Sequence, residues 1–376
     1  MKRILAGELR VGEALPWDIF DERGQLLLAA GTIIGSIRQV ESLLLRGALR
    51  TGPMARERGS VTVARGASDD EMETPFEQLD GLIQRLAAIF TGIESRQAAS
   101  SARCERLLER LEQLLETESD AMLGAIHLVH EHPYTLIHPI RCASLAALLC
   151  TTRGYAPARR RSVMLAALLQ NVSMLQLQQQ LVQQSGALSA AQQRLIEDHP
   201  EASARLAAAA GIDDGLALTI VRQHHERADG SGYPHRLGQE DILEEAGILQ
   251  LADRYCAMIA ARSYREALTP GESLRVLYTG QAGMWRSELI PQLIQMIGIY
   301  PPGSFVTLGS GETGIVVKRG KRSTEPLVRA YISPRGGPYP GIFTRDCSTP
   351  AFRIVRVAKP DLTIPFDLSR IWGYRE

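Results

Sequence analysis

The residues of this 376-residue chain with the clearest chemical potential lie at positions 224–234, which read HHERADGSGYP. Two adjacent histidines, His224 and His225, end an apolar, helix-like run over residues 216–222. Neighbouring side chains on a helix point about 100° apart, so the pair predicts ligands for two neighbouring metal ions rather than one. Glycines and a proline then predict a tight loop. Its defining residues are Asp229, Gly230, Gly232, Tyr233 and Pro234.

Taken as a unit, this HHExxDGxGYP pattern resembles the signature of the HD-GYP family, bacterial phosphodiesterases that open cyclic di-GMP at a metal centre. The resemblance extends over residues 121–310, about half of the chain. It implies a helical bundle of the HD superfamily. The alternative is a helix C-terminus that is merely rich in histidine.

The resemblance implies five metal ligands, because family members hold two or three metal ions within the bundle. The residues YTLIH at 134–138 match the family's first histidine motif, and a histidine before Pro200 matches an isolated one. The segment LADRY at 251–255 supplies the last aspartate. The implied ligands are His138, His199, His224, His225 and Asp253.

The chain departs from the family where the histidine–aspartate dipeptide should stand. Residues 168–174, LLQNVSM, align with the family's LLHDIGK, so Gln170 replaces the histidine, Asn171 the metal-bridging aspartate and Met174 the lysine. Amides are poor ligands and bring no negative charge to hold two dications together. Tyr134 stands where trinuclear members place an acidic ligand, which argues against a third metal. We therefore expect one divalent metal, iron or manganese, rather than a two-metal centre, with core histidines that bind no metal as the alternative.

Two arginines are candidates for binding phosphate. Arg262 and Arg265 are three residues apart, a spacing at which two guanidinium groups can grip one phosphate. Family members have phosphate-binding basic residues nine and twelve positions after the last aspartate, and both positions are basic here. The alternative is a pair of solvated arginines. The basic run KRGKR at 318–322 predicts a β-turn with plain solvated charge.

Composition narrows the class of protein. Lysine and arginine total 42, as do aspartate and glutamate, so the formal net charge is zero. A general DNA, RNA or membrane-surface binder carries net positive charge, so the balance of charges argues against these classes of protein. No apolar run approaches the roughly 18 residues of a membrane span. The 5 cysteines show no paired spacing, which predicts reduced, buried thiols in a cytoplasmic protein.

The chain is predicted to be mainly α, with a small N-terminal β-hairpin module and a small C-terminal β subdomain around the HD-superfamily bundle. A hairpin over residues 17–34 and a helix over 37–45 make up the first module. The predicted divisions are 1–52 for this module, 53–73 for a linker, 74–120 for a long helix or helical hairpin, 121–300 for the HD-GYP bundle and 301–376 for the β-rich subdomain.

Residues 74–118 carry an apolar repeat that starts behind a predicted capping box at Thr74 and Glu77. The repeat lapses at residues 97–100 and then resumes in phase. One interpretation is a single helix of ~45 residues, roughly 65 Å long, that forms a homodimeric coiled coil. The other is two helices that break near residues 98–101 and pack on the bundle.

Three functions remain open. The first is a degenerate HD-GYP protein in cyclic di-GMP signalling, which binds nucleotide or partner proteins such as GGDEF domains with little or no hydrolysis. The second is an active cyclic di-GMP phosphodiesterase with an altered metal site, and the third is a scaffold that ignores the nucleotide. Gln170 and Asn171 favour the first and third, because no catalytic set is intact. Arg262 and Arg265 favour the first over the third.

Overall fold

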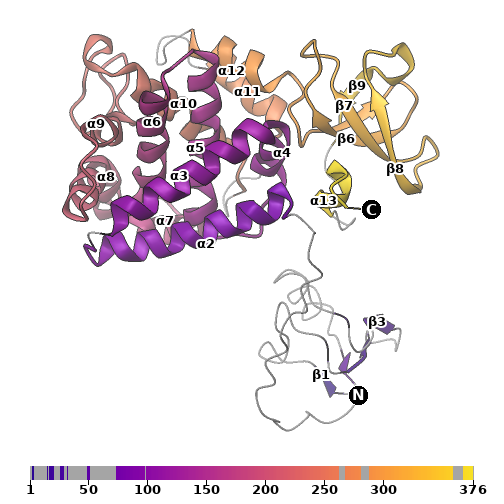
Figure 1. Cartoon of the computed structure of the whole chain (residues 1–376), viewed down its shortest axis with the longest axis horizontal. Coiled ribbons are helices and arrows are strands. Elements are labelled where there is room, and N and C mark those ends of the chain that lie inside the picture. Colours follow the sequence, from indigo (N-terminus) through magenta and orange to yellow (C-terminus); the bar gives the residue numbers. More distant parts are fainter. Residues whose placement is uncertain are drawn as a thin grey trace. The chain divides into compact units, whose positions relative to one another are not determined.

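The computed structural model describes residues 73–97, 99–261, 267–280, 288–358 and 367–375. Within the first 50 residues it also describes residues 2–3, 15, 17–20, 26–28, 32 and 49–50. The chain divides into two compact units, Met1–Glu71 and Met72–Glu376, which are described separately. Figure 1 shows the helices of the second unit and the sheet near its C-terminal end.

The described strands of the N-terminal unit form one antiparallel sheet in the order β1-β4-β2-β3. They are β1 (Lys2–Arg3), β2 (Ile19–Phe20), β3 (Leu26–Leu28) and β4 (Leu49–Arg50). Ile19 of β2 lies opposite Leu28 of β3, which confirms the predicted hairpin. Trp17 and Ile19 are buried. The helix predicted over residues 37–45 and nearly all of the predicted linker lie outside the described residues.

The second unit is mainly helical, as predicted, and α5 (Tyr134–Thr152) lies within its core. This helix packs against α6, α10 and α12. It is long and apolar enough to cross a membrane, with a mean hydropathy of 1.2, but its burial within the bundle accounts for that composition. The other helices before the sheet are α2 (Pro75–Glu94), α3 (Ser100–Thr117), α4 (Ser119–Leu128), α6 (Pro157–Leu169), α7 (Leu175–Gln183), α8 (Ala190–Ala209), α9 (Gly215–Gln223), α10 (Glu244–Met258), α11 (Pro270–Gly280) and α12 (Leu289–Ile297).

The apolar repeat of residues 74–118 forms a hairpin of two helices, α2 and α3. The predicted capping box begins α2: Thr74 N–H donates to Glu77 Oε2 at 2.9 Å, and Glu77 N–H donates to Thr74 Oγ1 at 3.4 Å. The helix ends at Glu94, so the interpretation as one continuous helix is wrong. Apolar residues of both helices are buried in the common core with α4, α5 and α6. The repeat therefore gives no support to a homodimer.

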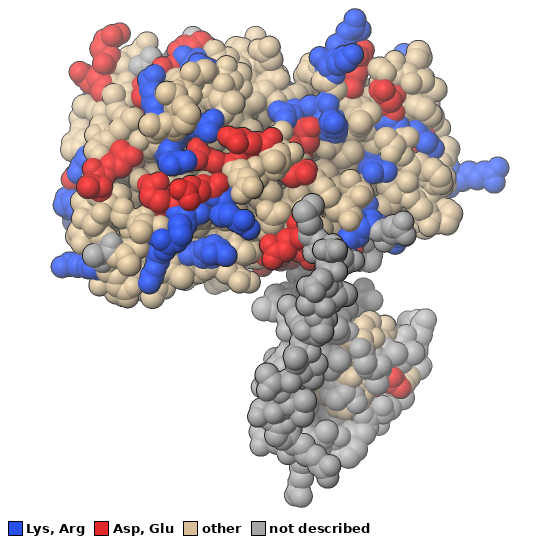
Figure 2. All heavy atoms as spheres, in the orientation of Figure 1, with Lys and Arg blue, Asp and Glu red and all other residues tan. Residues whose placement is uncertain are grey.

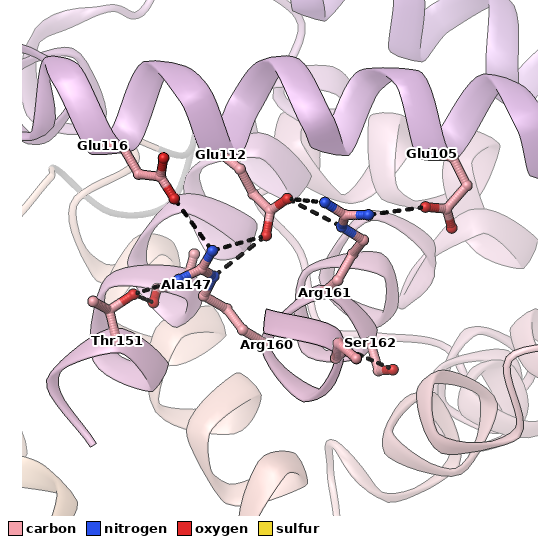
Figure 3. A network of polar contacts seen from close by, with 9 residues as sticks. Glu105, Glu112, Glu116, Ala147, Thr151, Arg160, Arg161 and Ser162 are labelled. Carbon is pink, nitrogen blue, oxygen red and sulfur yellow. Dashed lines mark hydrogen bonds and ion pairs between the residues drawn. The ribbon is translucent and has the colours of Figure 1, made fainter. Parts of the chain in front are cut away.

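Ion pairs add polar contacts between α3 and α6 (Figure 3). Glu112 of α3 is only 7% exposed and accepts from Arg160 at 3.2 Å and from Arg161 at 2.6 Å. Glu116 and Glu105 extend this network toward solvent. Acidic and basic side chains are interspersed on the face shown in Figure 2, as expected of a chain without net charge.

The C-terminal residues form an antiparallel sheet in the order β8-β7-β6-β5-β9, which confirms the predicted β subdomain. The strands are β5 (Phe305–Leu308), β6 (Thr313–Lys318), β7 (Leu327–Ile332), β8 (Pro338–Asp346) and β9 (Ile354–Val357). Strand β8 is not recognisable from its residue pattern. Its burial pattern is mixed and largely exposed, so no apolar alternation marks it as a strand.

Arg319 and the C-terminal residues contribute contacts between this subdomain and the helices. Arg319 donates to Ser119 Oγ at 2.7 Å and to the Met296 carbonyl at 2.9 Å, and it pairs with Asp120. The prediction of plain solvated charge is therefore wrong at Arg319. The chain then returns to α2 through α13 (Leu368–Trp372), where the Trp372 ring meets the Phe76 ring edge-to-face with centroids 5.3 Å apart.

Candidate metal and nucleotide site

Helices α5, α8, α9 and α10 bring the predicted metal ligands into two adjoining sets. Within each set the donor atoms lie within 4.8 Å of one another. One set is His199, His224 and His225, and the other is His138, Cys142 and Asp253. The Asp253 carboxylate acts electrostatically on His199, His224 and His225, so it connects the two sets.

Local sequence explains where the histidine-bearing helices begin and end. Ser189 and Gln192 form a capping box at the start of α8, and the Asp214 carboxylate accepts from Ala217 N–H at the start of α9. Helix α9 ends at Gln223, so His224 is its C-cap and His225 follows it. His224 itself keeps a backbone conformation close to helical, with φ −67° and ψ −9°. Both histidines fall in one donor set, and the number of ions that they serve stays a prediction.

Backbone carbonyls orient the rings of His199 and His224. His199 Nδ1 lies 2.5 Å from the Ile196 carbonyl, and His224 Nδ1 lies 2.6 Å from the Val221 carbonyl. A carbonyl oxygen only accepts, so both Nδ1 atoms carry the proton. In the neutral rings each Nε2 then presents a lone pair, and the two Nε2 atoms face each other at 3.2 Å. Two lone pairs do not hydrogen-bond, so a shared cation is the group that suits this geometry.

The surroundings keep these histidines neutral near pH 7. Burial and, to a smaller extent, the neighbouring His224 lower the pKa of His199 to about 3. Burial also lowers the pKa of His224 and of His225. A neutral imidazole is the form that binds metal.

In the second set, His138 Nε2 and Asp253 Oδ1 are 2.8 Å apart. Burial alone would raise the pKa of Asp253, but its hydrogen bond with His138 and the nearby His225 and His224 lower it below the ordinary value. The carboxylate is therefore ionised. Asp253 is the carboxylate among the six donors of the two sets, and its side chain is 18% exposed.

The replaced dipeptide lies between α6 and α7. Gln170 is fully buried, and neither its amide oxygen nor its amide nitrogen has a hydrogen-bond partner. Asn171 is 6% exposed and precedes the short 3-10 helix Val172–Met174. Helix α6 ends at Leu169, and Gln170 is its C-cap.

Glu226 determines the shape of the loop after the histidine pair. Its side chain is fully buried, with Oε1 accepting from His235 N–H at 2.6 Å and Oε2 from Leu237 N–H at 2.9 Å. Gly232 has no room for a side chain, because a Cβ there would lie 2.3 Å from the Arg227 nitrogen. The predicted tight loop is thus held by a buried carboxylate as well as by its glycines.

Two tyrosines connect the histidines to surface cavities. The Tyr233 ring centroid is 4.8 Å from that of His225, and Tyr233 lines a cavity of about 330 Å³ together with Glu197, Asp198 and Arg236. On the other set, Tyr134 stacks on His138 with centroids 4.7 Å apart. Tyr134 lines a cavity of about 670 Å³ whose walls include Gln176, Gln179, Gln180 and Gln183 of α7. Both cavities therefore border the candidate site.

Two predicted site residues lie outside the described part of the chain, and two residues near the site were not predicted. Arg262 and Arg265 lie outside the described residues, beyond the end of α10 at Met258. Sequence reasoning missed Cys142, although its position four residues after His138 places both on one helix face. It also assigned no role to Glu226. Metal binding by the predicted ligands stays a prediction.

The chain matches the family model described as "HD domain" over residues 100–285. It is 25% identical to the cyclic di-GMP phosphodiesterase PA4108 of Pseudomonas aeruginosa, over 77% of this chain and 68% of that protein. It is 26% identical to the cyclic di-GMP phosphodiesterase response regulator RpfG of Xanthomonas campestris, over 60% of this chain and 54% of that protein. The chain thus spans between about half and two thirds of these relatives.

A solved structure shares the fold. Bd1817, described as an HDG"Y"P protein from Bdellovibrio bacteriovorus, superposes with a TM-score of 0.54 at 16% identity. The match covers 78% of this chain and 97% of Bd1817. At that identity the likeness concerns the helical fold and not the activity.

Proposed function

Because this chain belongs to the HD-GYP family, we propose that it acts in cyclic di-GMP signalling as a metal-binding protein that binds the nucleotide with little or no hydrolysis. The names of its relatives, which include two cyclic di-GMP phosphodiesterases, support the ligand. The two sets of buried and partly buried donors support metal binding. The amides at Gln170 and Asn171 support the low hydrolysis.

The observation that carries metal binding is the pair of Nε2 atoms of His199 and His224 at 3.2 Å. Two nitrogen ligands of one ion, each roughly 2.0–2.1 Å from it, lie about 3.3 Å apart at a tetrahedral angle. The carbonyls of Ile196 and Val221 hold the rings in this tautomer, as second-shell groups do at metal sites. An ion bound there, iron or manganese in our proposal, would supply positive charge for a phosphate.

Hydrolysis requires more than a positive charge near phosphate. In a two-metal centre, the pair of ions stabilises both the attacking and the leaving oxygen. Asn171 offers a neutral amide where the family places a bridging carboxylate. Each tenfold loss of rate corresponds to about 1.4 kcal/mol of barrier, and loss of the bridge costs several such factors. Binding is not lost in the same way, because it needs only positive charge and a shaped surface.

The two cavities suggest how the rest of the nucleotide would be bound. The cavity beside Tyr233 has the carboxylates of Glu197 and Asp198 on its wall. Such groups repel phosphate but accept hydrogen bonds from a guanine base, whose pairing edge carries donors. We propose instead that the ion, Arg262 and Arg265 bind phosphate, because guanidinium groups suit bidentate contacts.

Calorimetry of the full-length protein with cyclic di-GMP, combined with chromatography of the products, tests this proposal. We expect binding without appreciable turnover. Arg262→Ala should weaken binding by about tenfold or more, and added salt should weaken it further, because charge-assisted contacts are lost or screened. Arg335→Ala, an exposed arginine of the C-terminal subdomain, is the matched control and should bind as the wild type does.

The triple variant Gln170→His, Asn171→Asp, Met174→Lys restores the family's residues and should gain turnover. Robust turnover by the wild-type protein in metal-supplemented, anaerobic buffer would favour the second candidate, an active phosphodiesterase with an altered site, which the names of the relatives favour. Absence of binding at millimolar nucleotide would overturn the proposal and leave the role of a scaffold. A pull-down of GGDEF domains with wild type and Tyr233→Ala would then test the predicted docking loop.

A further inference from the structure

Strand β9 is an edge of the C-terminal sheet and carries apolar side chains at the surface. The sheet has the order β8-β7-β6-β5-β9, so among the described strands β9 pairs with β5 alone. Val355 is 60% exposed and Val357 is 39% exposed. An unpaired edge with exposed apolar side chains is a surface to which another chain can add a strand.

The backbone of β9 directs hydrogen-bonding groups away from the sheet. Val357 lies opposite Val306 of β5, and the next residue, Ala358, donates its N–H to the Phe305 carbonyl at 2.8 Å. The N–H and C=O groups of successive residues point to opposite sides of a strand. Because Ala358 faces β5, the N–H and C=O groups of Val357 face away from it. They form a donor and an acceptor of the kind that an added strand uses.

The two edges of this sheet differ in how they are protected. Strand β8, at the opposite edge, contains Pro338, Pro340 and Gly341. Proline has no N–H to donate, so it hinders the addition of another strand to an edge. Strand β9 contains neither proline nor glycine. Its protection consists of arginines and of a bulge at Val355, which has no partner in β5. Strand β9 is therefore the more accessible edge.

The charge around β9 favours an acidic partner. Arg353 and Arg356 are exposed, and neither forms an ion pair with a carboxylate of the described residues. Residues 301–376 contain 12 lysines and arginines but 6 aspartates and glutamates, although the whole chain has no net charge. Opposite charges on paired strands are stabilising, whereas like charges directly opposite one another are destabilising. A second copy of β9 would bring arginines against arginines, and an acidic strand would bring carboxylates.

A single-stranded nucleic acid is another polyanion that suits basic charge. Proteins that bind such strands stack the bases on aromatic side chains, and β9 carries none. Contacts with phosphate also leave the exposed valines and the outward backbone groups of Val357 without a role. These observations favour an acidic peptide over a nucleic acid.

We propose that β9 is a docking edge for a partner protein that adds an extended, acidic strand with alternate apolar side chains. The backbone of that strand binds the outward groups of Val357, and its carboxylates pair with Arg353 and Arg356. Its apolar side chains cover Val355 and Val357. The edge includes no residue of the metal and nucleotide site, so this inference goes beyond the proposed function and does not depend on it.

Fluorescence anisotropy with the full-length protein tests the proposal, with a short synthetic peptide of alternating valine and glutamate as the probe. We expect saturable binding that weakens as salt is added. The double variant Arg353→Glu, Arg356→Glu should bind this peptide about tenfold or more weakly and should bind the valine–lysine analogue instead. Lys321→Glu, at an exposed position between β6 and β7, is the matched control, because it makes a charge change of the same kind in the same subdomain. Its affinity should stay within about twofold of wild type.

An N-methylated version of the valine–glutamate peptide separates strand pairing from attraction between charges. It keeps the carboxylates but lacks the N–H donors, so we expect it to bind about tenfold or more weakly than the unmodified peptide. Hydrogen exchange at Val357 should slow only when the unmodified peptide is bound, because that peptide protects the outward N–H group.

Several outcomes would overturn the docking edge. These are no binding at millimolar peptide, equal binding of the two peptides, or unchanged affinity in the double variant. Binding of a uridine oligonucleotide in preference to the acidic peptide would assign the basic charge to nucleic acid instead. Slow exchange at Val357 in concentrated protein without peptide would assign the edge to a second copy of the chain. None of these measurements involves a metal ion or cyclic di-GMP, so the proposed function stands or fails separately.

Discussion

At the scale of single residues, hydrogen bonds with backbone groups orient buried side chains around the site. His199 and His224 donate to carbonyls one turn earlier, and Glu226 accepts from two N–H groups of the following loop. Glu226 therefore connects the histidine pair to the exit of the loop that carries Tyr233. Its conversion to an amide changes one acceptor into a donor without changing the size of the side chain.

Glu226→Gln should destabilise the protein by ~1–3 kcal/mol, because one buried N–H would then face another donor. Urea denaturation followed by circular dichroism measures this loss. The matched control is Glu240→Gln, an exposed glutamate after the same loop, which should stay within about 0.5 kcal/mol of wild type. Equal stability of the two variants would show that the buried carboxylate does not hold the loop.

At the scale of elements, the apolar faces of the α2–α3 hairpin pack against the helical bundle. Apolar residues of both helices join the main core, and Glu112 adds buried ion pairs with Arg160 and Arg161 of α6. Removal of residues 74–118 would therefore expose the core of α4 and α5. That deletion cannot serve as a simple test of a dimer.

Glu112→Gln should lower the free energy of unfolding by ~1–3 kcal/mol, because two arginines would lose their charged partner at a buried position. Glu116→Gln is the control on the same helix. The Glu116 side chain is 68% exposed, so its pair with Arg160 should contribute no more than about 1 kcal/mol. Chemical denaturation of both variants at low and high salt makes the comparison. A loss at Glu116 as large as that at Glu112 would contradict the burial argument.

At the scale of the whole second unit, His127 joins three parts of the chain. Its Nδ1 donates to the Pro302 carbonyl before the sheet at 2.7 Å, and its Nε2 lies 2.8 Å from the Tyr255 hydroxyl of α10. Burial, assisted by the charges of Arg141 and His130 and opposed by the carbonyl of Pro302, lowers the pKa of His127 to about 4. The folded protein thus keeps this ring neutral where an unfolded chain would protonate it.

The sign of the pH effect follows from this lowered pKa. Between about pH 6.5 and pH 4 the unfolded chain binds a proton that folded His127 does not, so stability falls as pH falls, by up to ~1.4 kcal/mol per pH unit. His127→Gln should therefore show a flatter dependence in this window. The exposed His235→Gln should keep the wild-type slope. Urea titrations at several pH values measure the slopes, and equal slopes for wild type and His127→Gln would contradict the assignment.

The sequence alone indicated the family, the helical bundle, the N-terminal hairpin and the C-terminal sheet, and it named five of the six residues in the two donor sets. Those features are local, since motif spacing, capping residues and turn residues are written in neighbouring positions. The capping box at Thr74 is an example: two side chains three residues apart satisfy each other's backbone. The departure at Gln170 and Asn171 is equally visible in the sequence.

Only the tertiary structure showed which residues pack against each apolar helix face and which lie beside each potential metal ligand. An apolar repeat records which face of a helix is buried but not what covers it, so only the fold showed that α2 and α3 are covered within the chain. The structure also showed that α9 ends at Gln223, so that His224 is its C-cap. Likewise, Arg319 became a docking contact and Cys142 a neighbour of Asp253 through partners on other helices. Contacts between residues far apart in the chain depend on packing, and the periodicity of a single segment does not contain that information.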